Sequence, residues 1–267
     1  MDANIYAQVK ASIKQRLKID LENYKDEQMR RRLDSWLVRT RVNTWNDYFN
    51  LLSRDSEELE RFRNYLTINV TEFFRDANRW NALKEEILPY LLKNSMENRK
   101  VDGLKLWSAG CSIGAEAYTL AMMLAEVAPL QKYSILATDL DRGALLKARS
   151  RGPYTQEDIR NLSLMQRQKY LTSIAPFYVS ENLQKNIRFE EQDLLAARFD
   201  AGFDLIVCRN VVIYFTAEAK DKLYAKFCAA LRPGGVLFMG GTEIISGPAK
   251  YELQNFGISF YRKIGSI

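Results

Sequence analysis

The chain contains no histidine among its 267 residues. This absence excludes Ser-His-Asp and Cys-His catalysis, zinc bound through imidazole, and histidine acid/base shuttles. The three cysteines, Cys111, Cys208 and Cys228, are far apart in the sequence and form no CxxC pair. They therefore predict neither a metal knuckle nor a secreted disulfide framework, and we expect reduced, packed thiols and no metal site.

Long apolar runs and targeting signals are also missing. The most apolar window, residues 120–128, is interrupted by Glu126 and is too short to cross a bilayer. The segment 1–10 lacks the order of charged, apolar and small residues that marks a signal peptide. We therefore expect a cytoplasmic protein that does not insert into membranes.

Neither sign of charge dominates the composition. Lys and Arg number 39 against 33 Asp and Glu, which gives a net charge of +6. The surplus is small and no RNA-binding signature accompanies it, so we expect no nucleic-acid partner. A hydrophobic content of 47% with 27% charged residues is typical of a soluble globular protein, and the length allows one large or two ordinary domains.

Glycine and proline are absent from the first 68 residues, which therefore have few turn signals. Apolar residues recur there at helical spacing, for example Leu59, Phe62 and Leu66. Asp55 with Glu58 three residues later predicts a capping box at the start of that helix. We interpret residues 1–68 as a small all-helical domain.

After residue 100, apolar strands alternate with helices, which predicts a mostly parallel sheet covered on both faces. The expected strands are 104–110, 133–138, 186–192, 203–208, 236–239 and a final antiparallel one at 259–264. The expected helices are 116–127, 142–149 and 217–231. Residues 152–185 do not fit the alternation and are expected to form a small insertion, with a polar helix at 156–171 and an edge hairpin at 175–180.

In such a sheet, ligands bind beyond the carboxyl ends of the strands. The first strand leads into Gly110-Cys-Ser-Ile-Gly114, which carries Ser112 where a dinucleotide fingerprint has its middle glycine. That glycine lets the backbone approach a pyrophosphate. The substitution favours a cofactor that has a ribose but no phosphate, and S-adenosylmethionine is one.

Three further strand ends carry polar residues. Asp139 could accept two ribose hydroxyl hydrogen bonds or could cap the next helix, although Asp141 could cap it equally well. Asp193 could reach an adenine amino group. Arg209 and Asn210 end a buried apolar strand, where both would be costly if unpaired. Together these positions indicate a class I methyltransferase, by analogy at the level of the fold.

One further segment is more specific. Residues 69–76, Asn69-Val-Thr-Glu-Phe-Phe-Arg-Asp76, resemble the signature N-x-T-x-F-F-R-D of the bacterial chemotaxis receptor methyltransferases, the CheR family. The resemblance covers nearly the whole chain in order. It continues through Trp107–Glu116, Ala137–Asp139, Cys208–Phe215, Leu231–Gly235 and Gly240–Glu243.

The resemblance implies a Rossmann-like class I methyltransferase domain over residues 69–267, preceded by the helical domain. The implied activity moves the methyl group of S-adenosylmethionine to glutamate side chains of chemoreceptor helices, leaving S-adenosylhomocysteine. The family's cofactor-contacting positions fall on Asn69, Thr71, Arg75, Glu116, Asp139, Asp193, Leu194, Arg209 and Asn210. Family members often carry Asn at the position of Asp193. We hypothesise that Arg75 and Tyr214 shape the methyl-transfer site.

Five arginines, Arg30, Arg31, Arg32, Arg39 and Arg41, cluster on and after one helix of the first domain. They could be a solvated helix face, or they could dock the acidic receptor helices that the resemblance implies as substrate. The insertion occupies the place of the family's receptor-tethering subdomain. With little glycine in residues 173–180, we expect it to lack the extended loop that grips a receptor's C-terminal pentapeptide.

Two other functions remain open from the sequence. A methyltransferase on RNA or a small molecule would share the fold, although Arg209-Asn-Val-Val differs from the Asn/Asp-Pro-Pro-Tyr of many amino-methylating enzymes. A non-catalytic adaptor could keep the S-adenosylmethionine site without turnover. Nothing in the sequence demands more than a monomer.

Overall fold

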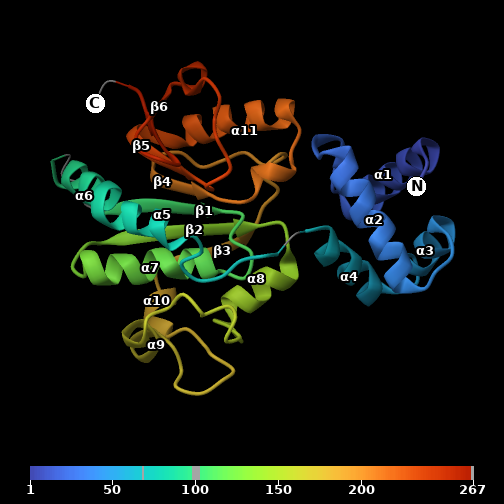
Figure 1. Cartoon of the computed structure of the whole chain (residues 1–267), viewed down its shortest axis with the longest axis horizontal. Helices are drawn as coiled ribbons and strands as arrows, with labels where there is room; N and C mark the ends of the chain where they lie inside the picture. The colour runs from blue at the N-terminus through green and yellow to red at the C-terminus, as the bar shows by residue number, and fades with distance from the viewer. Residues whose placement is uncertain (68, 98–102, 266–267) are drawn as a thin grey trace. The chain divides into compact units, whose positions relative to one another are not determined.

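The computed structural model describes residues 1–67, 69–97 and 103–265 (Figure 1). These residues form two compact units. The first comprises Met1–Ile68 together with Tyr214–Lys222, and the second comprises Asn69–Ile213 and Leu223–Ile267. The assignment of Tyr214–Lys222 to the first unit was not expected from the sequence.

The first unit is all-helical apart from its turns, as predicted. Its elements are α1 (Ala3–Leu17), η1 (Leu21–Asn23), α2 (Asp26–Thr40), α3 (Trp45–Leu52) and α4 (Ser56–Leu66). Aromatic rings from three of these helices form its core: Tyr48 lies 5.3 Å from Phe62 and 6.4 Å from Trp36, centroid to centroid. Such ring pairs stabilise a small domain beyond the area they bury.

Helix α4 begins as predicted, with Asp55 as its N-cap. The Asp55 carboxylate accepts hydrogen bonds from the backbone N–H groups of Glu57 and Glu58. The reciprocal half of the predicted capping box is wrong, because the buried Glu58 carboxylate accepts from the Tyr48 hydroxyl at 2.8 Å and pairs with Arg61. Tertiary contacts therefore occupy the Glu58 side chain that would otherwise complete the capping box.

The segment Tyr214–Lys222 joins the first unit through backbone hydrogen bonds. Lys25 N donates to Tyr214 O at 2.9 Å, and Thr216 N donates to Asn23 O at 3.0 Å. Between them, the Phe215 ring packs edge-on against Tyr24 at 5.1 Å. The chain around η3 (Val212–Tyr214) and the start of α11 (Ala217–Ala230) thus passes from one unit to the other.

In the described part of the chain, seven strands form one sheet in the order β3-β2-β1-β4-β5-β7-β6. The strands are β1 (Leu104–Ala109), β2 (Tyr133–Asp139), β3 (Ile187–Glu191), β4 (Phe203–Cys208), β5 (Leu231–Met239), β6 (Leu253–Asn255) and β7 (Phe260–Lys263). The first five are parallel and β7 is antiparallel to both of its neighbours. This confirms the predicted sheet; β6 was missed.

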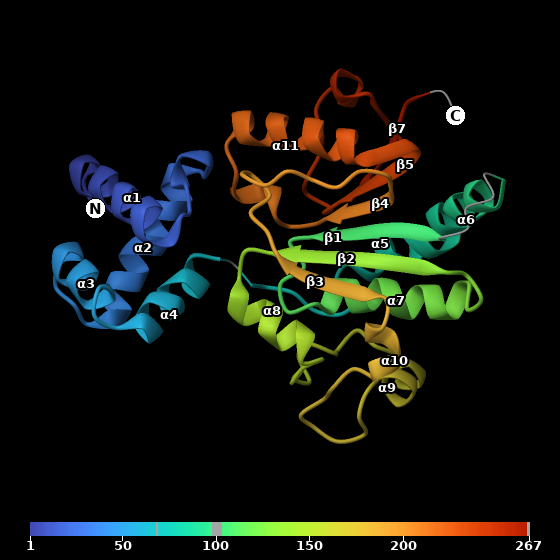
Figure 2. The same ribbon diagram turned by 180° about the vertical axis from the view of Figure 1, so that it is seen from behind.

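Helices cover both faces of the sheet (Figures 1 and 2). Helix α11 lies on one face, and α7 (Ala115–Val127) and α8 (Arg142–Arg149) lie on the other. The alternation along β1 sets this arrangement, because successive side chains of a strand point to opposite faces. Trp107 packs against Phe227 of α11 at 5.5 Å, and its neighbour Ser108 reaches Glu116 of α7.

The remaining helices complete the core. Helix α5 (Ala77–Ala82), a π-helical turn (Leu83–Ile87) and α6 (Leu88–Glu97) follow one another, and Trp80 of α5 packs edge-on against Phe238 of β5 at 5.4 Å. A 3-10 turn, η4 (Pro248–Tyr251), precedes β6. The three cysteines are free and buried, as expected. No helix within the described residues combines the length and apolar character needed to cross a bilayer.

The insertion departs from the prediction. Instead of one helix over 156–171, turns lead to the short α9 (Leu164–Tyr170), which begins where Ser163 and Gln166 form a capping box, and α10 (Glu181–Gln184) follows. The expected hairpin at 175–180 is reduced to isolated bridges, Tyr154 with Phe177 and Leu171 with Val179. The turns before Ser163 nevertheless bury Ile159 and Leu162 in the core.

Candidate active site

The order of the sheet reverses between β1 and β4, so ligand-binding residues are expected beyond their carboxyl ends. The loop after β1 turns sharply, with left-handed backbone at Gly110, Ser112 and Gly114. In this conformation the Ser112 N–H donates to Asp139 Oδ2 at 2.7 Å. The Asp141 N–H donates to Asp139 Oδ1 at 2.9 Å, so the Asp139 carboxylate joins the loops that follow β1 and β2.

Asp139 does not cap the helix that follows it. That role belongs to Asp141, whose Oδ1 accepts from the Ala144 N–H at 2.8 Å at the start of α8. A carboxylate has about four lone-pair positions, so two backbone bonds leave Asp139 able to accept the hydroxyls of a ribose. Burial raises the pKa of Asp139 to about 6, while its backbone hydrogen bonds oppose that shift.

The signature segment 69–76 crosses these same loops. Asn69 Oδ1 accepts from the Ser112 hydroxyl at 2.7 Å, and Asn69 Nδ2 donates to Asp141. Phe73 is fully buried and anchors the segment, with its N–H donating to Asp158 O at 3.0 Å. Asn69 thus bonds to Ser112 and Asp141, the two residues whose N–H groups donate to Asp139, and Thr71 is half-buried in the same segment.

Arg75 closes the segment on itself. Its guanidinium Nη1 donates to the carbonyl oxygen of Val70, five residues earlier. Burial raises the pKa of Glu116 and lowers that of Arg209, and the charge of Arg75 opposes the first shift and adds to the second. Arg75 therefore belongs to one electrostatic cluster with these two residues.

Arg209 is the most buried cation of this cluster, with 7% of its surface exposed. Its guanidinium lies 5.2 Å from the ring centroid of Trp80 and 4.9 Å from that of Phe238, and Nη2 donates to Asp76 Oδ2 at 2.7 Å. Its buried Nε has no hydrogen-bond partner among the described residues. An unsatisfied buried donor of this kind fits an anionic ligand group, such as the carboxylate of a methionine.

Glu116 lies in the first turn of helix α7 and is buried, with the Ser108 hydroxyl donating to its Oε1 at 2.6 Å. Burial raises the pKa of Glu116 to about 7 and the Glu243 charge adds to that, whereas Arg209, Ser108 and Arg75 oppose it. A buried carboxyl with a perturbed pKa beside two arginines is typical of a functional site.

Asp193 and Leu194 follow β3. The Asp193 Oδ1 accepts from the Leu195 N–H at 2.8 Å, which fixes the turn, and Leu194 is buried. Lys226 of α11 donates to the Leu194 carbonyl at 2.7 Å. One carboxylate oxygen of Asp193 thus already holds the loop, and its contact with adenine stays a prediction.

Tyr214 belongs to the first unit, whereas Arg75 belongs to the second. Their joint role at the methyl-transfer site therefore stays a hypothesis from the sequence. Asn210 lies directly after Arg209 with a left-handed φ of 59°, and its N–H donates to Glu243. Sequence reasoning did not single out Glu243, although the Gly240-Gly-Thr-Glu243 stretch was part of the resemblance.

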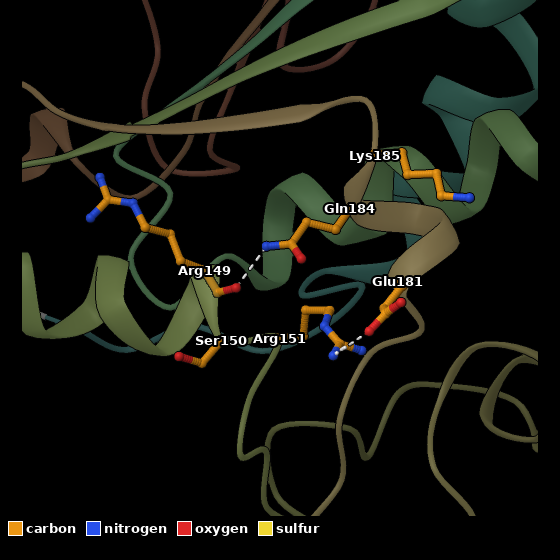
Figure 3. A pocket seen from close by; sticks show the side chains of 6 residues that line it. All are labelled: Arg149, Ser150, Arg151, Glu181, Gln184 and Lys185. Carbon is orange, nitrogen blue, oxygen red and sulfur yellow. Dashed lines mark hydrogen bonds and ion pairs between the residues drawn. The ribbon is translucent and has the colours of Figure 1, made fainter.

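An open pocket of about 480 Å³ lies elsewhere, between the C-terminal end of α8 and α10 (Figure 3). None of the predicted site residues lines it. Its polar groups hold the two elements together: Gln184 Nε2 donates to Arg149 O at 2.7 Å, and Arg151 pairs with Glu181 at 3.1 Å. The Arg149 guanidinium donates to Phe189 O. We do not assign this pocket to the reaction.

Comparison with known proteins identifies the family. Residues 69–260 match the family model described as CheR methyltransferase, SAM binding domain, and residues 4–67 match the CheR methyltransferase, all-alpha domain. This chain belongs to the CheR methyltransferase family. The resemblance found in the sequence is thereby confirmed, and the site described above lies within the S-adenosylmethionine-binding domain of that family.

Individual CheR-family relatives align along most of the chain. A chemotaxis protein methyltransferase of Listeria monocytogenes is 43% identical over 94% of this chain and 94% of its own length. One from Listeria innocua is 41% identical over the same shares of both chains. That of Escherichia coli K12 is 32% identical over 90% of this chain and 84% of its own.

Proposed function

We propose that this protein transfers the methyl group of S-adenosylmethionine to glutamate side-chain carboxylates on the cytoplasmic helices of chemoreceptors. The observation that carries the proposal is the cluster at the carboxyl ends of β1, β2 and β4. There the charge of Glu116 acts on a buried arginine with an unsatisfied Nε, and the Asp139 carboxylate joins the loops that follow β1 and β2. Together with family membership, this supports a site for a ligand that has a ribose and a carboxylate.

The residues divide the work of holding this ligand. Asp139 would accept the ribose hydroxyls, and the loop of Asp193 and Leu194 would face the adenine. Arg209 and Arg75 would hold the methionine carboxylate or the acceptor carboxylate, since guanidinium and carboxylate pair through two parallel hydrogen bonds. The bound cofactor supplies an electrophilic methyl group on its sulfonium.

The protein needs no general base for this reaction. A glutamate side chain has a reference pKa of about 4.3 and is already a carboxylate at neutral pH. The protein has only to align the acceptor with the methyl group and to exclude water, and Arg75 would provide the alignment. The absence of histidine is compatible with such chemistry.

The basic cluster of the helical unit is not one uniform surface. Arg32 donates through Nη2 to the carbonyl of Thr67 at 2.9 Å and through its guanidinium to that of Tyr65, so it holds the end of α4. Arg30 stacks over the Tyr6 ring at 4.4 Å. These two arginines therefore contribute to the fold of the unit.

The other members of the cluster, Arg31, Arg39 and Arg41, are exposed, although the Arg39 guanidinium also lies 5.5 Å from the Tyr65 ring centroid. We assign the docking of the acidic receptor helices to these three residues. Long-range attraction of this kind speeds encounter and weakens as salt is added. A protein of this function works in the cytoplasm and is recruited to membrane-bound receptors.

Incubation with labelled S-adenosylmethionine and chemoreceptor cytoplasmic domains tests the proposal. Base-labile label on the receptor is the expected result, because glutamate methyl esters hydrolyse in base. Cofactor binding without transfer would favour a signalling adaptor, and label only on RNA or a small molecule would favour another substrate. Arg75→Ala should lose turnover or cofactor affinity; full retention of both would refute the role of Arg75.

A further inference from the structure

Glu243 is a buried carboxylate in the loop after β5, with 4% of its surface exposed. Its Oε2 accepts from the Gly240 N–H at 2.8 Å and from the Asn210 N–H at 2.7 Å, and its Oε1 accepts from the Val212 N–H at 3.0 Å. Burying a carboxylate is costly unless it is hydrogen-bonded, and three backbone donors provide that compensation. Glu243 therefore ties the end of β5 to the loop after β4.

The loop that Glu243 holds contains Arg209 and Asn210. Asn210 has a left-handed backbone, which non-glycine residues adopt only at an energetic cost and which its surroundings must maintain. Its N–H and that of Val212, two residues on, both point at the same carboxylate. These two bonds fix the chain on the C-terminal side of Arg209, the buried cation of the site.

The fit around the carboxylate is tight. A Cβ atom added at Gly240 would lie 2.3 Å from Glu243 Oε2 and 3.0 Å from Asn210 N. Glycine at this position therefore permits the approach of the carboxylate. The charge of Glu243 also reaches the site: burial lowers the pKa of Arg209 and raises that of Glu116, and Glu243 opposes the first shift and adds to the second.

We infer that Glu243 is a positioning residue, whose carboxylate holds the Arg209–Asn210 loop in the conformation that binds the cofactor. It acts through the backbone of that loop and not by contact with the reacting groups. The inference rests on the proposed function, since it takes Arg209 and Asn210 as cofactor contacts.

Calorimetric titration of S-adenosylhomocysteine into the full-length protein and its Glu243→Gln variant tests this. The amide keeps the shape but loses the charge and turns an NH₂ group toward a backbone N–H. We expect the dissociation constant to rise about tenfold or more. Asp204→Asn is the matched control, because Asp204 is a fully buried carboxylate at the opposite end of β4 that accepts from the Lys105 N–H at 2.8 Å.

Thermal unfolding of the same variants separates positioning from general stability. Asp204→Asn should lower the melting temperature without changing the affinity, whereas Glu243→Gln should change the affinity. The inference would be overturned if both variants lost affinity in proportion to their loss of melting temperature. It would also be overturned if neither variant lost affinity. If Glu243→Gln does not fold, Glu243→Asp, which keeps the charge but is shorter by one methylene, is titrated with the same expected direction.

A double-mutant cycle adds a readout that a purely structural role would not move. In an Arg209→Ala background, Glu243→Gln should cause little further loss of affinity, because its effect passes through Arg209 and its loop. Fully additive losses would contradict the inference. Absence of S-adenosylhomocysteine binding by the unmodified protein would instead overturn the proposed function, and this inference with it.

Discussion

Arg209 donates to Asp76 through a 2.7 Å ion pair that links residues 133 positions apart in the sequence. The Arg209 side chain is 3% exposed, whereas that of Asp76 is 49% exposed. Asp76 also precedes α5 with a left-handed backbone. The last residue of the signature segment thus pairs with the Nη2 of this buried cation.

Asp76→Asn should destabilise the protein, because it removes one of the charges that, with Glu116, compensate a buried guanidinium. Asp76 is half-exposed, so we expect a loss of about 1–3 kcal/mol in the free energy of unfolding, measured by urea denaturation. Asp200→Asn is the control, since the Arg188–Asp200 pair is exposed on both sides and should change stability by less than about 0.5 kcal/mol. Equal effects of the two variants would contradict the buried pair.

Two adjacent glycines provide a matched test of the packing around Glu243. A Cβ at Gly240 would meet the Glu243 carboxylate, while one at Gly241 would meet nothing within 4 Å. Gly240→Ala should therefore lower the free energy of unfolding by about 1–3 kcal/mol and weaken S-adenosylhomocysteine binding. Gly241→Ala should leave both unchanged, and a Gly240→Ala protein that matches it would show that the carboxylate has room to move.

The arginines of α2 and its C-cap should separate by function. Reversal of Arg31, Arg39 and Arg41 to Glu should raise the KM for receptor roughly three- to tenfold, with kcat unchanged and a weaker dependence on salt. Arg54→Glu, at another exposed arginine of the same unit, is the control for KM. An unchanged KM in the triple variant would refute docking at these residues.

Arg32→Ala should instead act on stability. Its guanidinium holds the carbonyls of Tyr65 and Thr67, which would lose their donor at the end of α4. We expect about 1–3 kcal/mol less free energy of unfolding for the helical unit, measured by urea denaturation. Normal stability with a raised KM would place Arg32 in the docking surface after all.

Glu116 makes stability depend on pH. Its pKa is about 7 in the folded protein against 4.5 as the reference, so between these values the unfolded chain has lost a proton that the folded protein keeps. Folding therefore becomes less favourable as pH rises from about 4.5 to 7. Glu116→Gln removes this penalty. The free energy of unfolding of the variant, relative to that of the unmodified protein, should therefore increase by about 2–3 kcal/mol from pH 5 to pH 8.

Urea denaturation of both proteins at pH 5 and pH 8, without ligand, measures this difference. The other titrating groups, Asp139 included, are present in both proteins and largely cancel in the comparison. A constant stability difference across the two pH values would show that the pKa of Glu116 is the same in the folded and the unfolded protein.

The sheet could be predicted because its strands are nearly continuous apolar runs, as in β4, where every residue is buried. The residues at the strand ends could be located for the same reason, since each follows such a run. The helices of the insertion could not be predicted in this way, because α9 begins at a local capping box at Ser163 and is only seven residues long. Short strands such as β6, with three residues, carry too little pattern to be found.

The hydrogen-bond partners of the site could not be predicted, because they join distant parts of the chain. Glu243 accepts from the backbone N–H of Asn210, and this bond cannot be predicted because nearly every residue type has a backbone N–H. The sequence does not distinguish Arg32 from the neighbouring arginines, because its hydrogen bond to the Thr67 carbonyl depends on how the end of α4 packs. The pairing of Tyr214 with Asn23–Lys25 likewise depends on tertiary structure.

The most direct test of the central claim is to locate the transferred methyl group. Chemoreceptor cytoplasmic domains are incubated with this protein and S-adenosylmethionine, and the receptor peptides are sequenced by mass spectrometry before and after mild base. We predict methyl esters on receptor glutamates that disappear in base and are absent when Arg75→Ala replaces the unmodified protein. A base-stable methyl group, or receptor left unmodified while the cofactor is bound, would contradict the account.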